Sequence, residues 1–266
     1  MKIGVITSGN DTISLRSIFT RYDHEYLIYH DQLSFPFCQK NFDFITKKLN
    51  DDIDFLTSKG AETIIVDPIY ELALRENHFI LPLFQTYLRN EVLPHSLVGK
   101  LGILADIGSQ NAVQEILQNS LAQYQPSQAQ KSIKKFNFPF LYWIKSPKAR
   151  DRGISDLGIH NPYLIKTLKN DLRYFKDANV DSFIPLHYHY FQMQKTIKSF
   201  FNSHKTRFFD LSFIEKSFKN LTLNSKNSTY NVQIFTNQSC DFVTSNRHLM
   251  WLMERGKESK VIINEI

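Results

Sequence analysis

Two short segments of this chain combine a predicted strand with side chains that can transfer protons. The residues Ser182–Leu186 have the pattern of a buried strand, and they lead directly into His187-Tyr188-His189 before a helix predicted to begin near Phe191. An earlier strand, Thr63–Val66, ends in the same way at Asp67. The carboxyl ends of strands in open α/β sheets face the ligand crevice. Asp67, His187 and His189 are therefore candidate catalytic residues.

The chemistry open to these groups is general acid and base catalysis. An imidazole has a reference pKa near 6.5, so His187 can accept or donate a proton at neutral pH. Asp67 can act as the opposite partner where burial raises its pKa. A carboxylate is a weak base toward an unactivated amino-acid α-proton. Such a pair therefore suits a more acidic substrate, an isomerisation or a decarboxylation.

A metal site is a second alternative at the same place. Imidazoles two residues apart on an extended backbone point to one side, so His187 and His189 can bind one ion together. Asp67 or Asp106 would supply a third ligand. A third ligand at fixed spacing is missing from the sequence, and we assign no metal ligands. His30 and Asp31 follow another predicted strand, and there we favour a surface loop with a capped turn over a wall of the ligand cleft.

The elements that must position these residues repeat along the chain. A strand, a small polar turn and a helix recur in both halves, which predicts an α/β protein with two similar open lobes facing each other across a central cleft. We place the first crossing between the lobes near Leu97. The predicted strands are Lys2–Thr7, Tyr26–His30, Thr63–Val66, Val98–Ala105, Ser182–Leu186, Asn231–Phe235 and Val261–Ile263, and the predicted helices are 12–20, 42–59, 72–78, 112–124, 162–176, 191–201 and 213–221.

Composition restricts the class of protein. With 266 residues, of which 42% are hydrophobic and 22% charged, the chain can form two modest globular lobes. It contains no apolar run of membrane-spanning length, and its first residues are predicted to form a strand, so we expect a cytoplasmic protein without a membrane partner. Cys38 and Cys240 are its two cysteines, which fits a reducing compartment. The net charge is +6, but the sequence shows no basic helix with interleaved aromatic residues, and we do not expect nucleic-acid binding.

Several landmarks of the chain match one family in order and spacing. They are Ile3-Gly4-Val5-Ile6 with Ser8-Gly9, Asp31 with Pro36-Phe37, Lys100–Ala105, Asp181–Tyr190 and a tail at 231–242. Over essentially its full length the chain resembles glutamate racemase, of the aspartate/glutamate racemase superfamily. The resemblance implies a first lobe made of 1–97 plus 208–266 and a second lobe of 98–207. It also implies a cofactor-free protein that takes a small acidic amino acid or dicarboxylate between its lobes.

The resemblance further implies a mechanism that this chain cannot use. Two cysteines of the family act as base and acid on opposite faces of the substrate α-carbon, since a thiol can serve in either form. Here Asp67-Pro68-Ile69 replaces the family's first Cys-Asn-Thr, and His187-Tyr188-His189 replaces its Cys-Thr-His. The residues expected to contact a carboxylate substrate are Ser8, Gly9, Pro36, Phe37 and Ser109, while Tyr188 occupies volume where the family holds a small Thr.

These departures lead to a main expectation and its alternatives. We expect a protein of racemase lineage that no longer racemises and is retained to bind a small acidic ligand or a partner. The first alternative is an active isomerase, racemase or decarboxylase-type enzyme with Asp67 and His187 as its acid/base pair. The second is the metal-dependent site at His187 and His189. A second copy of the chain, forming a homodimer, is a further candidate partner.

Overall fold

The computed structural model forms two compact units, each built on a parallel sheet. It describes residues 1–7, 10–22, 24–31, 33–34, 40–74, 77–92, 100–106, 140–146, 161–201, 206–222, 231–237 and 260–265. Unit 1 comprises Met1–Pro82 and Leu211–Ile266, and unit 2 comprises Leu83–Asp210. Every strand pairing in the described chain is parallel. The α/β class predicted from the sequence is confirmed.

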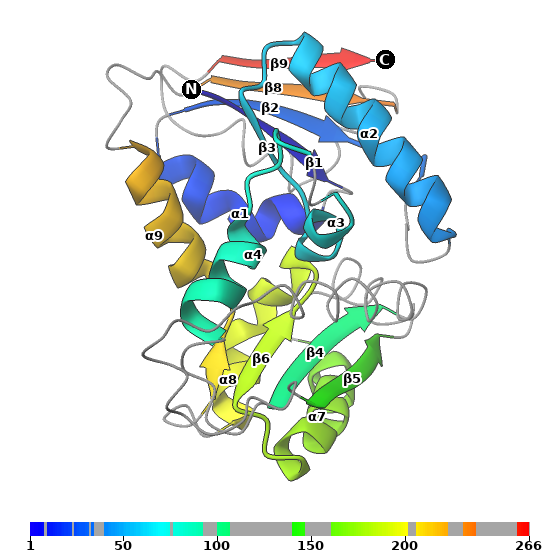
Figure 1. Ribbon diagram of the computed structural model, residues 1–266, viewed down its shortest axis with the longest axis vertical. Coiled ribbons are helices and arrows are strands. Elements are labelled where there is room, and N and C mark those ends of the chain that lie inside the picture. Colours follow the sequence, from blue (N-terminus) through cyan, green and yellow to red (C-terminus); the bar gives the residue numbers. More distant parts are fainter. Residues whose placement is uncertain are drawn as a thin grey trace, which may run out of the picture. The chain divides into compact units, whose positions relative to one another are not determined.

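Unit 1 has a five-stranded sheet in the order β3-β1-β2-β8-β9. The C-terminal strands β8 and β9 return to the sheet that the N-terminus begins. Helix α2 covers one face, and α1 and α9 cover the other (Figure 1). The elements are β1 (Lys2–Thr7), α1 (Asn10–Arg21), β2 (Glu25–His30), α2 (Phe42–Ser58), β3 (Thr63–Ile65), α3 (Pro68–Ala73), α9 (Leu211–Thr222), β8 (Asn231–Thr236) and β9 (Lys260–Glu265).

Helix α2 shows why these residues form these elements. Its apolar residues Ile45, Leu49, Ile53 and Leu56 recur at helical spacing and are at most 3% exposed. Asn41 caps the first turn, because its side chain accepts a hydrogen bond from Phe44 N at 2.8 Å. The helix ends at Ser58, and Gly60 follows the C-cap Lys59 with a φ of +94°, which favours glycine. The sequence predicted both ends within a residue.

Unit 2 has a four-stranded sheet in the order β5-β4-β6-β7. Helices α7 and α8 lie on the same face of this sheet and share a core with it, in which Leu168, Phe175, Phe183 and Ile197 are at most 3% exposed. The elements are α4 (Leu83–Tyr87), the π-helical turn η2 (Leu88–Val92), β4 (Lys100–Asp106), β5 (Phe140–Ser146), α7 (Pro162–Asp177), β6 (Ser182–Pro185), the 3₁₀ helix η3 (Tyr188–Met193), α8 (Gln194–Phe200) and β7 (Arg207–Phe208).

The boundary between the units comes earlier in the chain than the expected position near Leu97. Helix α4 belongs to unit 2 because its aromatic rings pack there. The ring of Phe84 lies 5.4 Å from that of Phe209, and the ring of Tyr87 lies 4.9 Å from it. Unit 2 therefore starts at Leu83 and continues through Asp210.

Two predicted elements differ from the structure near the candidate site residues. The helix expected at 72–78 begins at Pro68, directly after Asp67, since proline is favoured at the first helical position. The strand expected to reach Leu186 ends at Pro185, and a 3₁₀ helix starts at Tyr188. The helix predicted at 112–124 lies outside the described residues. Within the described part of the chain, none of the helices has the length and apolar character to cross a bilayer.

Candidate functional site

Asp67 stands at the junction between β3 and α3 in unit 1. Its side chain is 6% exposed. Its carbonyl oxygen accepts hydrogen bonds from Tyr70 N at 2.9 Å and from Glu71 N at 3.0 Å, which makes Asp67 the residue that starts the helix. The position follows a strand of a parallel sheet, where ligand-binding groups are commonly placed.

His187 occupies the corresponding junction in unit 2. Its backbone is extended, with φ −129° and ψ 134°, and it precedes the 3₁₀ helix η3. The side chain is 5% exposed, and its ring lies 6.3 Å from the ring of Tyr190. Asp67 and His187 therefore each sit at a strand end as predicted, one in each unit.

The expectation that His187 and His189 share one face of a strand is wrong. His189 lies inside the 3₁₀ helix, so two-residue strand alternation does not relate the two side chains. Tyr188, Tyr190 and Phe191 are all buried in this 3₁₀ helix. Among the side chains that the structure describes, no group of three His, Cys, Asp or Glu could hold a metal ion. The His189 side chain is not among them, and the metal alternative stays a prediction.

Tyr188 lies within an aromatic cluster of unit 2. The residue is 2% exposed, and its ring meets that of Phe191 edge-on at 5.4 Å. Phe191 in turn contacts Phe209 at 5.6 Å, and Phe209 contacts Phe84 and Tyr87. Burial, with a smaller effect from the charge of Asp210, raises the pKa of the Tyr87 phenol above its usual range. The end of β6 is thus filled by aromatic volume.

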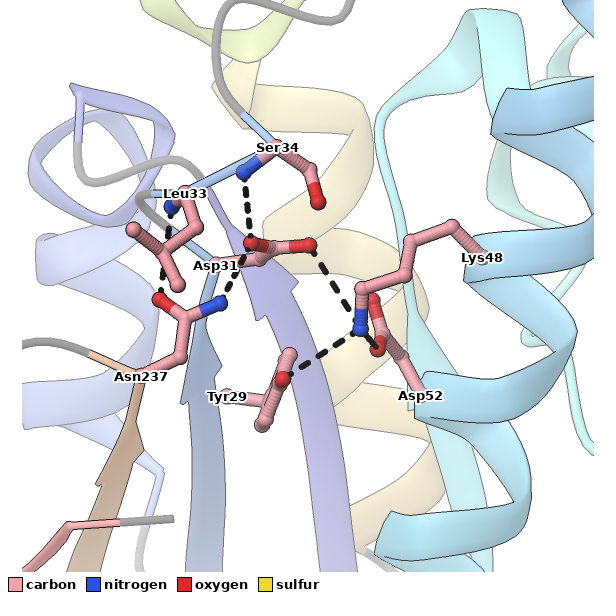
Figure 2. A network of polar contacts seen from close by, with 7 residues as sticks. All are labelled: Tyr29, Asp31, Leu33, Ser34, Lys48, Asp52 and Asn237. Atoms are coloured by element: carbon pink, nitrogen blue, oxygen red, sulfur yellow. Dashed lines mark hydrogen bonds and ion pairs between the residues drawn. The ribbon is translucent and has the colours of Figure 1, made fainter.

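A network of polar contacts surrounds Asp31, immediately after β2. Figure 2 shows its carboxylate at the centre of a network drawn from β2, β8, α2 and the turn at Leu33-Ser34. Asp31 is 0% exposed and accepts hydrogen bonds from Asn237 Nδ2 at 2.7 Å and Ser34 N at 3.0 Å. The side-chain oxygen of Asn237 accepts a bond from Leu33 N at 3.3 Å. The expected capped turn is present, but the expected surface position is wrong, because the Asp31 carboxylate is buried.

Lys48 on α2 provides the positive charge of this network. Its Nζ lies 3.7 Å from Asp31 Oδ2, pairs with Asp52 one turn along the helix, and lies 3.4 Å from the Tyr29 hydroxyl (Figure 2). The same ammonium sits 5.1 Å from the centre of the Tyr29 ring. The Lys48 ammonium therefore interacts with two buried carboxylates and with one face of an aromatic ring.

The network contains two carboxylates, Asp31 and Asp52, but one ammonium, Lys48. The pKa values of Asp52 and Lys48 are both shifted in this environment. Burial raises the pKa of Asp52 to about 7, against the lowering effect of the Lys48 hydrogen bond and with a further rise from Asp31. Burial acts to lower the pKa of Lys48, but the hydrogen bond and charge of Asp52 outweigh it, and the net shift is upward. With this pKa, which burial raises most strongly, Asp52 takes up a proton near neutral pH.

The last residues of β1, β2 and β8 add a buried polar row beside this network. Thr7 pairs with His30 and His30 pairs with Thr236, and each of the three is at most 2% exposed. Asp31 N donates to Thr7 O at 3.1 Å, which joins the row to the network. This sheet edge offers fixed polar groups at the place where ligands of parallel sheets bind.

Sequence reasoning found only part of this arrangement. Asp31 was a landmark of the resemblance, and Lys48 and Asp52 have the i, i+4 spacing of a helical ion pair, a signal that could have identified them. Asn237 carries no such signal, because it comes from the far end of the chain. The predicted substrate contacts Ser8, Gly9, Pro36, Phe37 and Ser109 lie outside the described residues.

No family model matches the sequence, and no curated protein matches it either. Several solved structures, in contrast, are similar to this chain. Glutamate racemase isoform RacE1 from Bacillus anthracis has a TM-score of 0.72 at 16% identity, covering 99% of this chain and 96% of its own. Glutamate racemase from Thermus thermophilus, in complex with β-chloro-D-alanine, has a TM-score of 0.71 at 12% identity, covering 100% and 96%.

A more distant similarity extends to a second activity. The aspartate racemase of Picrophilus torridus has a TM-score of 0.54 at 14% identity, with 86% of this chain and 97% of that chain covered. Identities this low describe the fold and not the reaction. With both sheets and their parallel order in view, the chain has the two-lobed α/β fold of the glutamate racemases.

Proposed function

We propose that this protein binds a small acidic amino acid or dicarboxylate without racemising it. The observation that carries the proposal is the identity of the two strand-end residues. Asp67 follows β3 and His187 follows β6, where the resemblance would require a thiol at each place. The two cysteines of the sequence, Cys38 and Cys240, are elsewhere. A two-thiol reaction has no base and no acid at these positions.

The packing around Tyr188 supports the same conclusion. The family holds a small threonine at this position, according to the resemblance, and the tyrosine ring is here buried against Phe191. A fixed ring of this size restricts the space beside His187. A buried aromatic ring replaces the small hydroxyl that the resemblance would place beside the substrate, and this favours binding without the family's reaction.

The test is proton NMR of the full chain in D₂O with glutamate, aspartate and small dicarboxylic acids. We expect saturable binding of at least one acid and no loss of its α-proton signal over a day. Asp67→Asn and His187→Gln are the matched variants, since each keeps a similar shape and changes the acid or base. If none of the acids binds and none exchanges its α-proton, the proposal is overturned.

The second candidate is an acid/base enzyme that uses Asp67 and His187. What favours it is the burial of both titratable side chains, at 6% and 5% exposure, because buried ionisable groups at strand ends are common in active sites. The same NMR experiment separates the two. Loss of the α-proton signal that stops in either variant would replace the binding proposal with this one.

A further inference from the structure

The charge of the chain is concentrated in unit 2. Residues 83–210 contain 17 Lys and Arg against 9 Asp and Glu, a net charge of +8, while the remaining residues carry −2. The overall value of +6 hides this asymmetry. A strong imbalance between two parts of one chain is typical of proteins that bind an anionic polymer or surface.

Helix α7 presents part of this charge on a rigid support. Asn161 caps its first turn by accepting hydrogen bonds from Tyr163 N at 2.9 Å and Leu164 N at 3.3 Å. Its apolar face enters the core of unit 2, where Leu164, Leu168, Leu172 and Phe175 are at most 3% exposed. The opposite face is therefore held in a fixed orientation toward solvent.

That opposite face combines cations with exposed aromatic rings. Tyr163 is 72% exposed and Tyr174 is 53% exposed, and they are eleven positions apart, which places them on one side of the helix about 16 Å from each other. Between and beside them lie four exposed cations. We call this set of residues the α7 outer face: Tyr163, Lys166, Lys169, Arg173, Tyr174 and Lys176.

Few negative charges oppose these cations on the helix itself. Asp171 is half-buried and Asp177 lies in the last turn, so the stretch between Tyr163 and Tyr174 carries exposed cations and the neutral Asn170 but no exposed acidic residue. The Nζ of Lys176 lies 5.2 Å from the centre of the Phe200 ring on α8, which holds one cation against the adjoining helix. The sequence was expected to lack a basic helix with interleaved aromatic residues, and α7 is such a helix.

We propose that the α7 outer face binds single-stranded nucleic acid. Lys and Arg side chains along a surface attract the phosphate backbone, and exposed tyrosine rings give unpaired bases a surface on which to stack. A membrane is less suited to this face, because the apolar side of α7 that would insert is already buried in the core. An acidic protein segment would form ion pairs with the cations, but it would not require the two exposed tyrosine rings. This proposal does not depend on the ligand proposed above.

The experiment is fluorescence anisotropy of a labelled 20-nucleotide oligo-dT titrated with the full chain. We expect saturable binding that weakens about 20- to 50-fold between 50 and 200 mM salt, as three or four phosphate contacts to a single strand would give. The double variant K166Q/R173Q should weaken binding and lower the salt slope by about 1.4. The double variant Y163S/Y174S should weaken binding at least fivefold with an unchanged salt slope, because it removes stacking but no charge.

Helix α2 of unit 1 supplies the matched control. Phe44 is 45% exposed there and Lys47 is also exposed, so F44S/K47Q makes the same kinds of change on a different helix and should leave binding unchanged. All the altered side chains are exposed, and circular dichroism will verify the fold of each variant. No binding of oligo-dT at 50 mM salt would overturn the proposal. The proposal would also be overturned if K166Q/R173Q weakened the binding of oligo-dT and Y163S/Y174S did not. Tighter binding of the chain to phosphatidylserine vesicles or to poly-glutamate than to oligo-dT would overturn it as well.

Discussion

The two units close the carboxyl ends of their strands by different means. In unit 1 the end of β2 is held by directed polar contacts, with Asp31 joined to Asn237, to Ser34 and to Lys48. In unit 2 the end of β6 is held by aromatic volume, with Tyr188 packed on Phe191 and Phe191 on Phe209. The two ends occupy similar places in similar parallel sheets.

This difference teaches how each strand end would respond to a ligand. A polar network fixes the direction of donors and acceptors and can exchange one partner for a ligand oxygen at small cost. An aromatic cluster fixes volume and admits a ligand only where space is left. Directed polar contacts therefore predominate at the strand end of unit 1, and packed aromatic rings predominate at that of unit 2.

The largest expected effect comes from opening the aromatic cluster. Phe209 is 1% exposed and contacts three aromatic rings, so Phe209→Ala should lower the free energy of unfolding of unit 2 by about 3 to 5 kcal/mol. Hydrogen exchange of the β6 peptide, read by mass spectrometry, measures this unit separately. Tyr174→Ala removes an exposed ring in the same unit and should change little. An effect below 1 kcal/mol for Phe209→Ala would show that volume does not hold this strand end.

Removing the centre of the polar network should cost somewhat less. Asp31→Ala leaves Asn237 and Ser34 N without their acceptor and takes a buried charge from Lys48, so we expect a loss of about 2 to 4 kcal/mol in unit 1. Exchange of the β2 peptide is the measurement. Asp54→Ala, which removes an exposed carboxylate from α2, is the control. Equal protection of β2 in the Asp31 variant and in the control would remove the contrast between the two units.

The pH dependence of unit 1 tests the excess charge of the same network. The pKa of Asp52 is about 7 in the folded chain, against about 3.9 for an unfolded aspartate. The folded state therefore binds the extra proton between about pH 4 and pH 7, and stability that is fully present below pH 4 is lost as the pH rises through 7. We expect unit 1 to lose on the order of 1 to 2 kcal/mol over this window.

The matched variant for this prediction is Asp52→Asn, which cannot ionise. Its stability in urea unfolding should stay flatter between pH 4 and 7, so that it equals or exceeds the wild type at pH 8. A wild-type curve that rises with pH across this window, with the variant parallel to it, would show that Asp52 is ionised throughout. Unit 2 should show no matching dependence on this residue.

Particular residues show how much of this could be read from the sequence. Helix α2 and strands β1 and β2 follow from apolar spacing and from Asn41 and Gly60 at the helix ends, all of which are local signals. Local sequence signals likewise predicted that Asp67 and His187 lie at strand ends. The Asn237 contact was not predictable, because it joins positions 206 residues apart and depends on where β8 enters the sheet.

The sequence also failed to predict the 3₁₀ helix that follows β6, for a related reason. The 3₁₀ helix here packs Tyr188 against Phe191, and Phe191 against Phe209, a residue that follows β7 and also contacts Phe84 of α4. The basic outer face of α7 was missed because the lysines were counted along the chain and not around the helix. Only the first of these failures concerns packing partners that lie far away in sequence.

The smallest expected effect is the difference in stability cost between two matching glycine substitutions, one in a strand of each unit. Gly4 in β1 and Gly102 in β4 each allow a close approach to the strand. A Cβ at Gly4 would meet Ile64 Cγ1 at 2.9 Å and Leu56 Cδ1 at 3.2 Å, whereas at Gly102 it would meet Phe175 Cδ1 at 3.1 Å and Val180 Cγ2 at 3.2 Å. Ile64 Cγ1 lies close to its own backbone and cannot move aside easily. We therefore expect Gly4→Ala to cost about 2 kcal/mol and Gly102→Ala about 1 kcal/mol.

Both glycine variants are measured by hydrogen exchange of the strands that they alter, β1 in unit 1 and β4 in unit 2. Each strand serves as the control for the other, because a substitution in one unit should leave exchange in the other unchanged. A larger cost at Gly102 would mean that Phe175 is held more rigidly than Ile64. The aromatic packing of unit 2 would then extend from its strand end to the centre of its sheet, and the contrast with unit 1 would hold for the whole core.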